Sequence, residues 1–291
     1  PAAYYFPTFK RMSSLEVLKG APLLRYGPQT TGGVINLIST PIPDEQKGYV
    51  EAVTNERGST DVHATYGDTN GDWGYLFETV QRSAQGFKDI DRSNRNSGFD
   101  ISDYVGKLRW QGDRQSVTAK LQYSEETSNS TYVGLTDADF NQDPNRRYGL
   151  SSPDQMDNTH SGVSLTHQFE WSDNVSSTTT LYRNDFKRNW YKLSGAGNII
   201  DQANAGDANA QGILDGTVDT SGLNYKNNAR EYVSQGVQTN FDVNIGNHEF
   251  DFGARAHEDE MDRFQPVDVY DQVNGSLVFQ NSVAPTGSNN R

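Results

Sequence analysis

The chain has 291 residues, 33% of them hydrophobic, and its mean hydropathy of −0.79 is low for a water-soluble globule that must bury a large core. Its 25 basic and 38 acidic side chains give a formal charge of −13, which argues against nucleic acid as a partner. The absence of cysteine excludes disulfides, thiolate metal sites and cysteine nucleophiles.

The first 43 residues form a unit of their own. Pro41 and Pro43 flank a single residue, and prolines so spaced suit neither a helix interior nor a central strand, so they predict an extended connector. The unit opens at Pro1 without a charged and apolar leader, and we expect the natural N-terminus to lie upstream. No run in the sequence reaches the roughly 18 apolar residues of a spanning helix, which excludes helical membrane insertion.

Residues 44–291 show the alternation of apolar and polar side chains that is typical of β-strands. The composition agrees, because the 27 Gly favour turns, whereas the 15 Tyr and 13 Phe favour pleated, half-buried surfaces. We predict about nine strands of roughly ten residues, the length that a tilted strand needs to cross hydrocarbon. The clear cases are 62–66, 104–110, 117–123, 163–171, 233–243 and 250–256, with weaker ones near 49–55, 73–81 and 177–187.

Short and long connections alternate between these strands. Short turns are predicted at 67–72, 111–115, 172–176 and 246–247, and long excursions at 82–100, 124–160 and 187–230. Alternation along the strands fits a soluble antiparallel sandwich or a sugar-binding β-helix equally well. The loop pattern and the aromatic strand ends favour an outer-membrane barrel, with tight periplasmic turns, long outer loops and interfacial rings. The rings are Tyr66, Trp73, Trp110, Tyr123, Phe169 and Trp171.

The first unit also carries three linked elements in a fixed order: LEVLKG at Leu15–Gly20, LRYGPQ at Leu24–Gln29 and GGVINLIS at Gly32–Ser39. With them the chain resembles the C-terminal half of the plug domain of TonB-dependent outer-membrane receptors. The segment RYGPQ and the stretch Gly134–Asp139 resemble the corresponding segments of the ferric-citrate receptor branch. The resemblance implies an all-β fold in which residues 1–43 end the plug. Residues 44–291 then supply about nine or ten of the 22 strands of a transmembrane antiparallel β-barrel, Ser276–Gln280 beginning the tenth.

The same resemblance implies TonB-energised uptake of a ferric chelate, ferric citrate or another siderophore, across the bacterial outer membrane. The expected partners are the chelate, outer-membrane lipid and lipopolysaccharide, and the TonB–ExbB–ExbD system acting through a region N-terminal to this chain. Iron arrives as part of the cargo, so no cofactor is expected. Two alternatives stay open: a passive porin or adhesin-like barrel without energy coupling, and a soluble carbohydrate-binding β protein.

Catalytic and metal-binding patterns are not found. The sequence has no G-x-S-x-G, H-E-x-x-H or P-loop, and its five histidines are never four residues apart, so we expect no enzyme. Residues 137–143 begin like a calcium loop. However, Gln142 replaces the turning glycine and Tyr148 the bidentate Glu, so no metal site is predicted.

An anionic ferric chelate requires converging cations, and Arg pairs bidentately with carboxylates. In the predicted 187–230 excursion the bases lie at the two ends and the acids in the middle, which places positive charge at the barrel mouth. By resemblance, ferric-citrate receptors use arginines from this region. We therefore predict substrate contacts from Lys187, Arg188, Lys226 and Arg230, and from a second pair, Arg146 and Arg147. The alternative for each is a solvated or lipopolysaccharide-facing charge.

In the first unit, Arg25 and Gln29 either face the cargo from an apical loop or pin loops to the barrel wall. The resemblance implies that Lys19 locks the plug to acidic residues of the barrel, with Lys in place of the commoner Arg. Four glycines are predicted to be structural, because they allow positive φ or a close approach of strands: Gly20, Gly27, Gly32 and Gly33.

Overall fold

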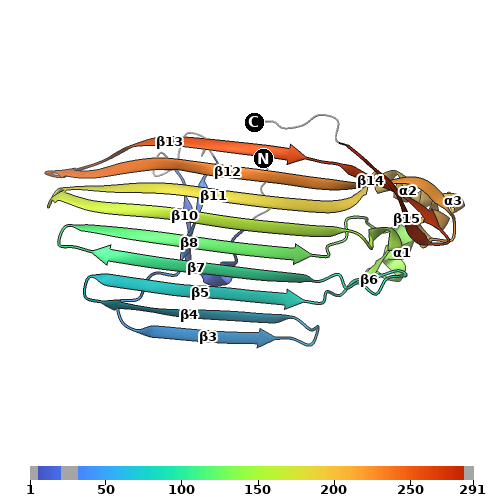
Figure 1. The fold of residues 1–291 in the computed structure, drawn as a ribbon, viewed down its shortest axis with the longest axis horizontal. Coiled ribbons are helices and arrows are strands. Elements are labelled where there is room, and N and C mark those ends of the chain that lie inside the picture. The colour runs from blue at the N-terminus through green and yellow to red at the C-terminus, as the bar shows by residue number, and fades with distance from the viewer. Residues whose placement is uncertain (1–5, 21–31, 285–291) are drawn as a thin grey trace.

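The computed structural model describes residues 6–20 and 32–284 (Figure 1). The N-terminal segment, residues 6–43, contains the 3-10 turn η1 (Phe9–Arg11) and an antiparallel pair of strands, β1 (Met12–Leu18) and β2 (Val34–Ser39). It contacts one face of a much larger sheet. We call that face the inner face and the opposite one the outer face.

The large sheet confirms the predicted partial antiparallel barrel. Nine long strands of the described residues pair in chain order, each antiparallel to the next. They are β3 (Lys47–Thr54), β4 (Thr60–Asn70), β5 (Trp73–Ala84), β7 (Phe99–Gln111), β8 (Gln115–Ser128), β10 (Gln155–Ser172), β11 (Val175–Ser194), β12 (Thr220–Ile245) and β13 (His248–Phe264).

One end of the sheet carries tight turns, and the other carries the long connections (Figure 1). At the turn end, Gly71 and Gly246 have φ of 57° and 61°, which glycine adopts without strain. The alternation was predicted, but the excursions are shorter, at 85–98, 129–154 and 195–219, because the strands extend further than their apolar pattern. The bases predicted at the ends of a loop from Lys187 to Arg230 therefore lie inside β11 and β12.

The N-terminal segment is attached to the inner face by charged groups. The Arg11 Nε donates to Asp103 Oδ2 at 2.6 Å, with both side chains almost fully buried. The Lys107 Nζ donates to the Thr40 carbonyl at 2.5 Å, and the Thr40 hydroxyl donates to Glu78 at 2.8 Å. Since side chains alternate along a strand, the neighbours of these inner residues face outward.

The outer face carries an exposed apolar band. Trp73 pairs with Trp110 near the turn end, and Tyr104 pairs with Tyr123 nearer the loops. Trp110 and Tyr104 are six residues apart on β7, or about 20 Å, close to the height of the outward apolar band of an outer-membrane barrel. Phe77, Leu121, Val163, Leu165 and Leu181 lie on the same face, each more than 40% exposed. The outer face therefore has the exposed apolar side chains that a lipid-facing surface requires.

The long connections pack together into a cap at one end of the sheet (Figure 1). The cap contains α1 (Asp137–Gln142), η3 (Gly149–Ser151), α2 (Ala196–Asn204), α3 (Ala208–Asp215) and the short parallel pair β6 (Asp89–Ile90) and β9 (Arg146–Arg147). It has a hydrophobic core of its own, made of Val133, Tyr148, Leu150, Leu193, Ala196, Leu214, Leu223 and Tyr225. The main core of the described chain thus lies at the cap end of the sheet, and it includes Leu193 of β11 and Tyr225 of β12.

The edge of the sheet confirms a further strand prediction. Ser276–Gln280 belongs to β15 (Ser276–Val283), which forms a hairpin with β14 (Val267–Val273). β14 continues β13 along β12, because Val267 pairs with Lys226 in the same register that pairs Phe264 with Ala229. β15 turns back beside β14 at the edge of the large sheet, so it begins the predicted tenth strand.

No helix of the described residues is long and apolar enough to span a bilayer. Within the same ranges, no group of three or more His, Asp and Glu side chains is placed to hold a metal ion. The stretch that begins like a calcium loop contains the helix α1, with the Thr136 hydroxyl capping its N-terminus.

Candidate functional site: a cationic inner wall

Three arginines lie side by side across β11, β12 and β13. Arg188 pairs in register with Arg230, and Arg230 pairs with Arg263. Side chains directly opposite on neighbouring strands have Cβ atoms about 4.5–5.5 Å apart, and like charges so placed destabilise a sheet. We call these residues the arginine row. An anion bound across the row would relieve this repulsion.

The arginine row belongs to the inner face. Arg188 pairs in register with Asn158 of β10, whose side-chain amide donates to Glu126 at 3.2 Å. Asn158, Glu126 and residues 6–9 of the N-terminal segment line one cavity of about 210 Å³. The row therefore continues the wall of a cavity between the sheet and the N-terminal segment. Arg188 is 3% exposed, and Arg230 Nη1 donates to the Tyr232 hydroxyl at 3.3 Å.

Further cations continue the wall toward the cap. Lys192 of β11 pairs in register with Lys226 of β12, and alternation puts both on the face of the arginine row. The Lys192 Nζ lies 3.3 Å from the ring centroid of Tyr132 and 3.7 Å from that of Trp190. These rings stabilise the cation through their π faces. We call the arginine row together with Lys192, Lys226 and Trp190 the inner wall.

The predicted substrate residues are divided between the two faces. Arg188, Lys226 and Arg230 lie on the inner wall. Lys187 lies on the outer face, because consecutive residues of a strand point to opposite sides. Its Nζ is 3.1 Å from Glu231 Oε1, and both side chains are more than half exposed. Arg263 was not predicted. Its only signal is its register with Arg230, which the sequence alone does not reveal.

The second predicted pair serves the cap instead. The Arg146 guanidinium lies 3.0 Å from Asp91, 2.9 Å from Asp139 and 2.7 Å from Asp215. Burial alone would lower the pKa of Arg146, but hydrogen bonds to Asp91 and Asp215 outweigh it and raise the pKa. The Arg147 side chain donates to the carbonyl of Pro144 at 2.9 Å. Arg146 is thus neutralised by three carboxylates of the chain itself.

The roles predicted in the N-terminal segment are only partly found. Arg11, with the half-buried pair Lys10–Glu51, locks the segment to the sheet, whereas Lys19 is exposed and makes no ion pair with a described residue. Gly20 and Gly33 have φ of 80° and 124°, as predicted; at Gly32, φ is not positive and an added Cβ would meet no atom within 4 Å. Arg25, Gln29 and Gly27 lie outside the described residues.

A buried acid joins the cap to the upper end of β11. The Asp154 carboxylate accepts hydrogen bonds from the backbone N–H of Tyr132 at 2.8 Å and of Leu193 at 3.2 Å. It is 1% exposed, and burial raises its pKa from 3.8 to about 6 despite these bonds. Asp154 therefore controls the position of Tyr132, one of the rings that hold Lys192.

We expect the cap to become more stable as the pH falls through about 6. The raised pKa means that the folded cap binds the Asp154 proton more tightly than the unfolded chain does, so the stabilisation is complete below 3.8 and is lost as the pH rises through about 6. Its full size is on the order of 3 kcal/mol. Amide exchange at Tyr132 and Leu193 should register a little under half of this gain between pH 7 and 5. Asp154→Asn should abolish this pH dependence, and an unchanged slope in that variant would contradict the assignment.

Comparison with known proteins identifies what the chain is similar to. No family model matches the chain. Over 195 residues, 59% of the chain, it is 24% identical to the probable TonB-dependent siderophore receptor PirA of Acinetobacter baumannii, and the match covers 24% of that protein. The chain thus spans about a quarter of this curated relative.

Solved structures of receptors share the fold. The ferric citrate transporter FecA in its unliganded form superimposes with a TM-score of 0.63 at 17% identity, over 94% of this chain and 38% of that one. The pyoverdine outer-membrane receptor FpvA from Pseudomonas aeruginosa, bound to pyoverdine, superimposes with a TM-score of 0.60 at 14% identity, over 90% of this chain and 36% of that one. These similarities confirm the predicted resemblance to TonB-dependent receptors and the outer-membrane barrel fold. The similar proteins are transport receptors, not enzymes.

Proposed function

From the fold of a TonB-dependent outer-membrane receptor, we propose that this chain takes part in the energised uptake of an anionic ferric chelate. Residues 1–43 act as the C-terminal part of the plug, and residues 44–291 form the first barrel strands. The observation that carries the proposal is the inner wall, where five cations from three neighbouring strands lie on the inner face, the face that the N-terminal segment contacts. Energy reaches the plug from TonB, ExbB and ExbD.

The inner wall suits a multiply charged anion. Arginine presents planar pairs of N–H donors that match carboxylates, and a charge-assisted bond of this kind contributes about 1.5–3 kcal/mol. Bound carboxylates would also offset the repulsion within the arginine row. Ferric citrate is the cargo that we favour over another siderophore, because its carboxylates fit these donors. The solved structure of a ferric citrate transporter with the same fold supports this choice.

A passive porin fits the arrangement less well. The N-terminal segment lies across the inner face and is held there by the buried Arg11–Asp103 pair. A pore without energy coupling has no use for a locked segment in its lumen. The exposed apolar band of the outer face likewise disfavours a soluble carbohydrate-binding protein.

Charge reversal on the two faces of neighbouring strands tests the proposal. Arg230→Glu should weaken ferric dicitrate binding at least tenfold, measured by calorimetry on the purified receptor carrying this chain. Lys187→Glu is the matched control, because it changes the charge equally on β11 but on the outer face, and it should leave binding within about twofold. Equal losses in both variants, or undiminished binding in Arg230→Glu, would refute the inner wall as the binding surface. Iron uptake with and without TonB tests the energy coupling.

A further inference from the structure

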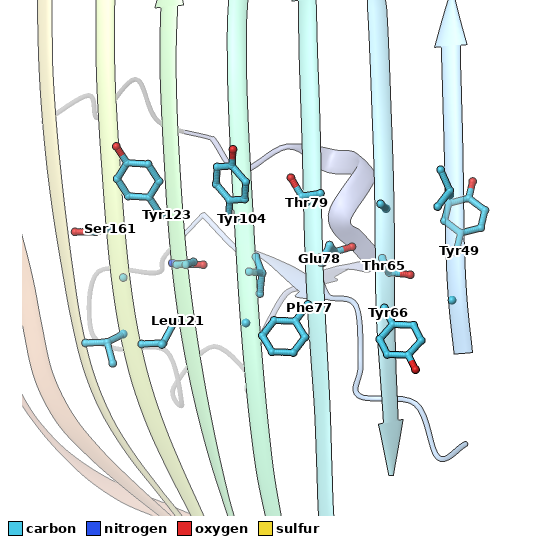
Figure 2. Close-up of a pocket in the computed structure, with 18 of the residues that line it drawn as sticks. Tyr49, Thr65, Tyr66, Phe77, Glu78, Thr79, Tyr104, Leu121, Tyr123 and Ser161 are labelled. Atoms are coloured by element: carbon cyan, nitrogen blue, oxygen red, sulfur yellow. The ribbon is translucent and has the colours of Figure 1, made fainter. Parts of the chain in front are cut away.

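A small polar hollow lies on the inner face, nearer the turn end than the arginine row. Its volume is about 200 Å³, and its lining includes Lys120, Gln122, Gly162, Ser164, Tyr182 and Asn184. Figure 2 shows Leu121 and Tyr123 of β8 on the side of the strands opposite to the N-terminal segment, so the residues that alternate with them face the inner side. Tyr182 is six residues from Arg188 along β11, which places the hollow about 20 Å closer to the turns than the arginine row.

Two glycines make room for the hollow. Gly162 of β10 stands in register between Gln122 and Asn184, and a Cβ there would lie 2.6 Å from the Gln122 amide nitrogen and 2.7 Å from the Asn184 amide oxygen. The two amides meet across this glycine, where Gln122 donates to Asn184 at 3.4 Å. Gly236 of β12 does the same for Tyr182, because a Cβ there would lie 2.7 Å from the Tyr182 hydroxyl. The Tyr182 ring therefore leans over β12, and the space above β10 stays open.

Side chains of β13 hold the Tyr182 ring in this position. The Tyr182 hydroxyl lies 2.6 Å from His257 Nδ1 and accepts a hydrogen bond from Arg255 Nε at 3.1 Å. His257 Nε2 lies 3.0 Å from Asp259 Oδ1, which fixes the orientation of the imidazole. The ring is thus a fixed wall of the hollow, and Arg255 adds positive charge on this side.

Lys120 brings the charge of the hollow from the opposite side. It is half-buried and pairs in register with Lys107 of β7, and like charges directly opposite each other destabilise a sheet. Lys107 Nζ donates to a backbone carbonyl of the N-terminal segment, whereas Lys120 makes no hydrogen bond or ion pair within the part of the chain that the structure describes. The charges that act on it most are those of Lys107, Arg11, Asp103 and Glu78. With Lys120 these groups are three cations and two acids, so an anion in the hollow would balance them.

An aromatic layer separates the hollow from the arginine row. Phe186 of β11 and Tyr232 of β12 stand in register on the inner face, and their rings stack with centroids 5.9 Å apart. Phe186 is almost fully buried. The inner face of β11 thus passes from the cation Arg188 through this layer to the polar hollow. The separation of about 20 Å is more than one small chelate spans, so the two places would bind an anion separately.

We propose that the hollow is a second anion station, which takes a carboxylate of the ferric chelate after the chelate has left the arginine row. The inference rests on the proposed function and adds a step to it. The Lys120 ammonium pairs with the carboxylate, and the side chains of Gln122, Asn184 and Ser164 offer hydrogen bonds around it. This pairing offsets the loss of the arginine contacts as the anion crosses the aromatic layer. A single ammonium is a point charge without the planar fork of arginine, which suits a station that the cargo must leave again.

Removal of the Lys120 charge tests the station. In cells that produce the intact receptor, Lys120→Met should slow TonB-driven uptake of ferric dicitrate about tenfold, the effect of one lost charge-assisted contact. Equilibrium binding to the purified receptor should stay within about twofold, because the arginine row is unchanged, and this binding also shows that the variant is folded. Lys120→Arg keeps the charge and should restore most of the uptake. Arg183→Met is the matched control, since it removes a cation beside Tyr182 from the outer face, and uptake should stay within about twofold.

Three results would overturn the station. The first is undiminished uptake in Lys120→Met. The second is an equal loss of uptake in Lys120→Arg, because the shape of the lysine and not its charge would then matter. The third is a loss of equilibrium binding in Lys120→Met as large as its loss of uptake, because Lys120 would then belong to the first binding surface. Failure of the proposed function is distinguishable, because Arg230→Glu would then bind ferric dicitrate as well as wild type does.

Discussion

Replacing Arg11 with Met should release the N-terminal segment from the inner face at a cost of about 3–5 kcal/mol, the usual result of removing one partner from a buried ion pair. Arg11 Nε and Asp103 Oδ2 are 2.6 Å apart, and the two side chains are 2% and 0% exposed. Without Arg11, the Asp103 carboxylate stays buried without its countercharge. Hydrogen exchange at β1 and β2 of the intact receptor would measure the loss.

Two further variants separate the ion pair from general damage. Lys10→Met removes the pair with Glu51, whose side chains are 29% and 40% exposed, and should cost less than about 1 kcal/mol. The double variant Arg11→Met with Asp103→Leu removes both charges and should recover most of the stability, because no isolated charge remains. If Arg11→Met costs no more than Lys10→Met, the buried pair is not what holds the segment in place.

The barrel strands could be predicted from the sequence because each strand has lipid on one side and polar groups on the other. Its side chains must therefore alternate between apolar and polar. Val117, Ala119, Leu121 and Tyr123 alternate with Thr118, Lys120 and Gln122, and this pattern follows directly from a strand between two different solvents. Above the membrane both faces are polar or packed in the cap. The extension of β11 beyond Lys187 therefore carries no alternation, and its sequence does not distinguish it from a loop.

The candidate site was predictable in its residue types but not in its geometry. The concentration of bases around 187–230 indicates β11 and β12, the strands that carry most of the inner wall. The strand register decides which bases face inward, because a shift of one residue exchanges the two faces. This register places Arg188 on the inner face and its neighbour Lys187 on the outer face. Arg263 joins the row only through strand pairing. The Arg11–Asp103 lock links residues 92 positions apart, so no local motif predicts this pair.

Removal of the Arg146 charge should have the second large effect, on the cap. Arg146→Gln leaves Asp91, Asp139 and Asp215 close together without a cation, although each comes from a different long connection. Their side chains are 12–33% exposed, so solvent screens part of the repulsion and the cost should be about 2–3 kcal/mol, less than for Arg11.

This loss should appear as local opening of the cap, since the strands of the sheet do not depend on Arg146. Limited proteolysis of the intact receptor should cut Arg146→Gln within 195–219 much faster than wild type, while the sheet stays protected. Arg147→Gln is the matched control, because this neighbour donates to nearby backbone carbonyls and forms no ion pair with a described residue, so cleavage should stay within about twofold of wild type. Equal cleavage in both variants would mean that the apolar core of Leu150, Leu214 and Tyr225 holds the connections together without the ion cluster. Faster cleavage in Arg146→Gln alone would show that these four side chains join three separate loops into one unit above the inner wall.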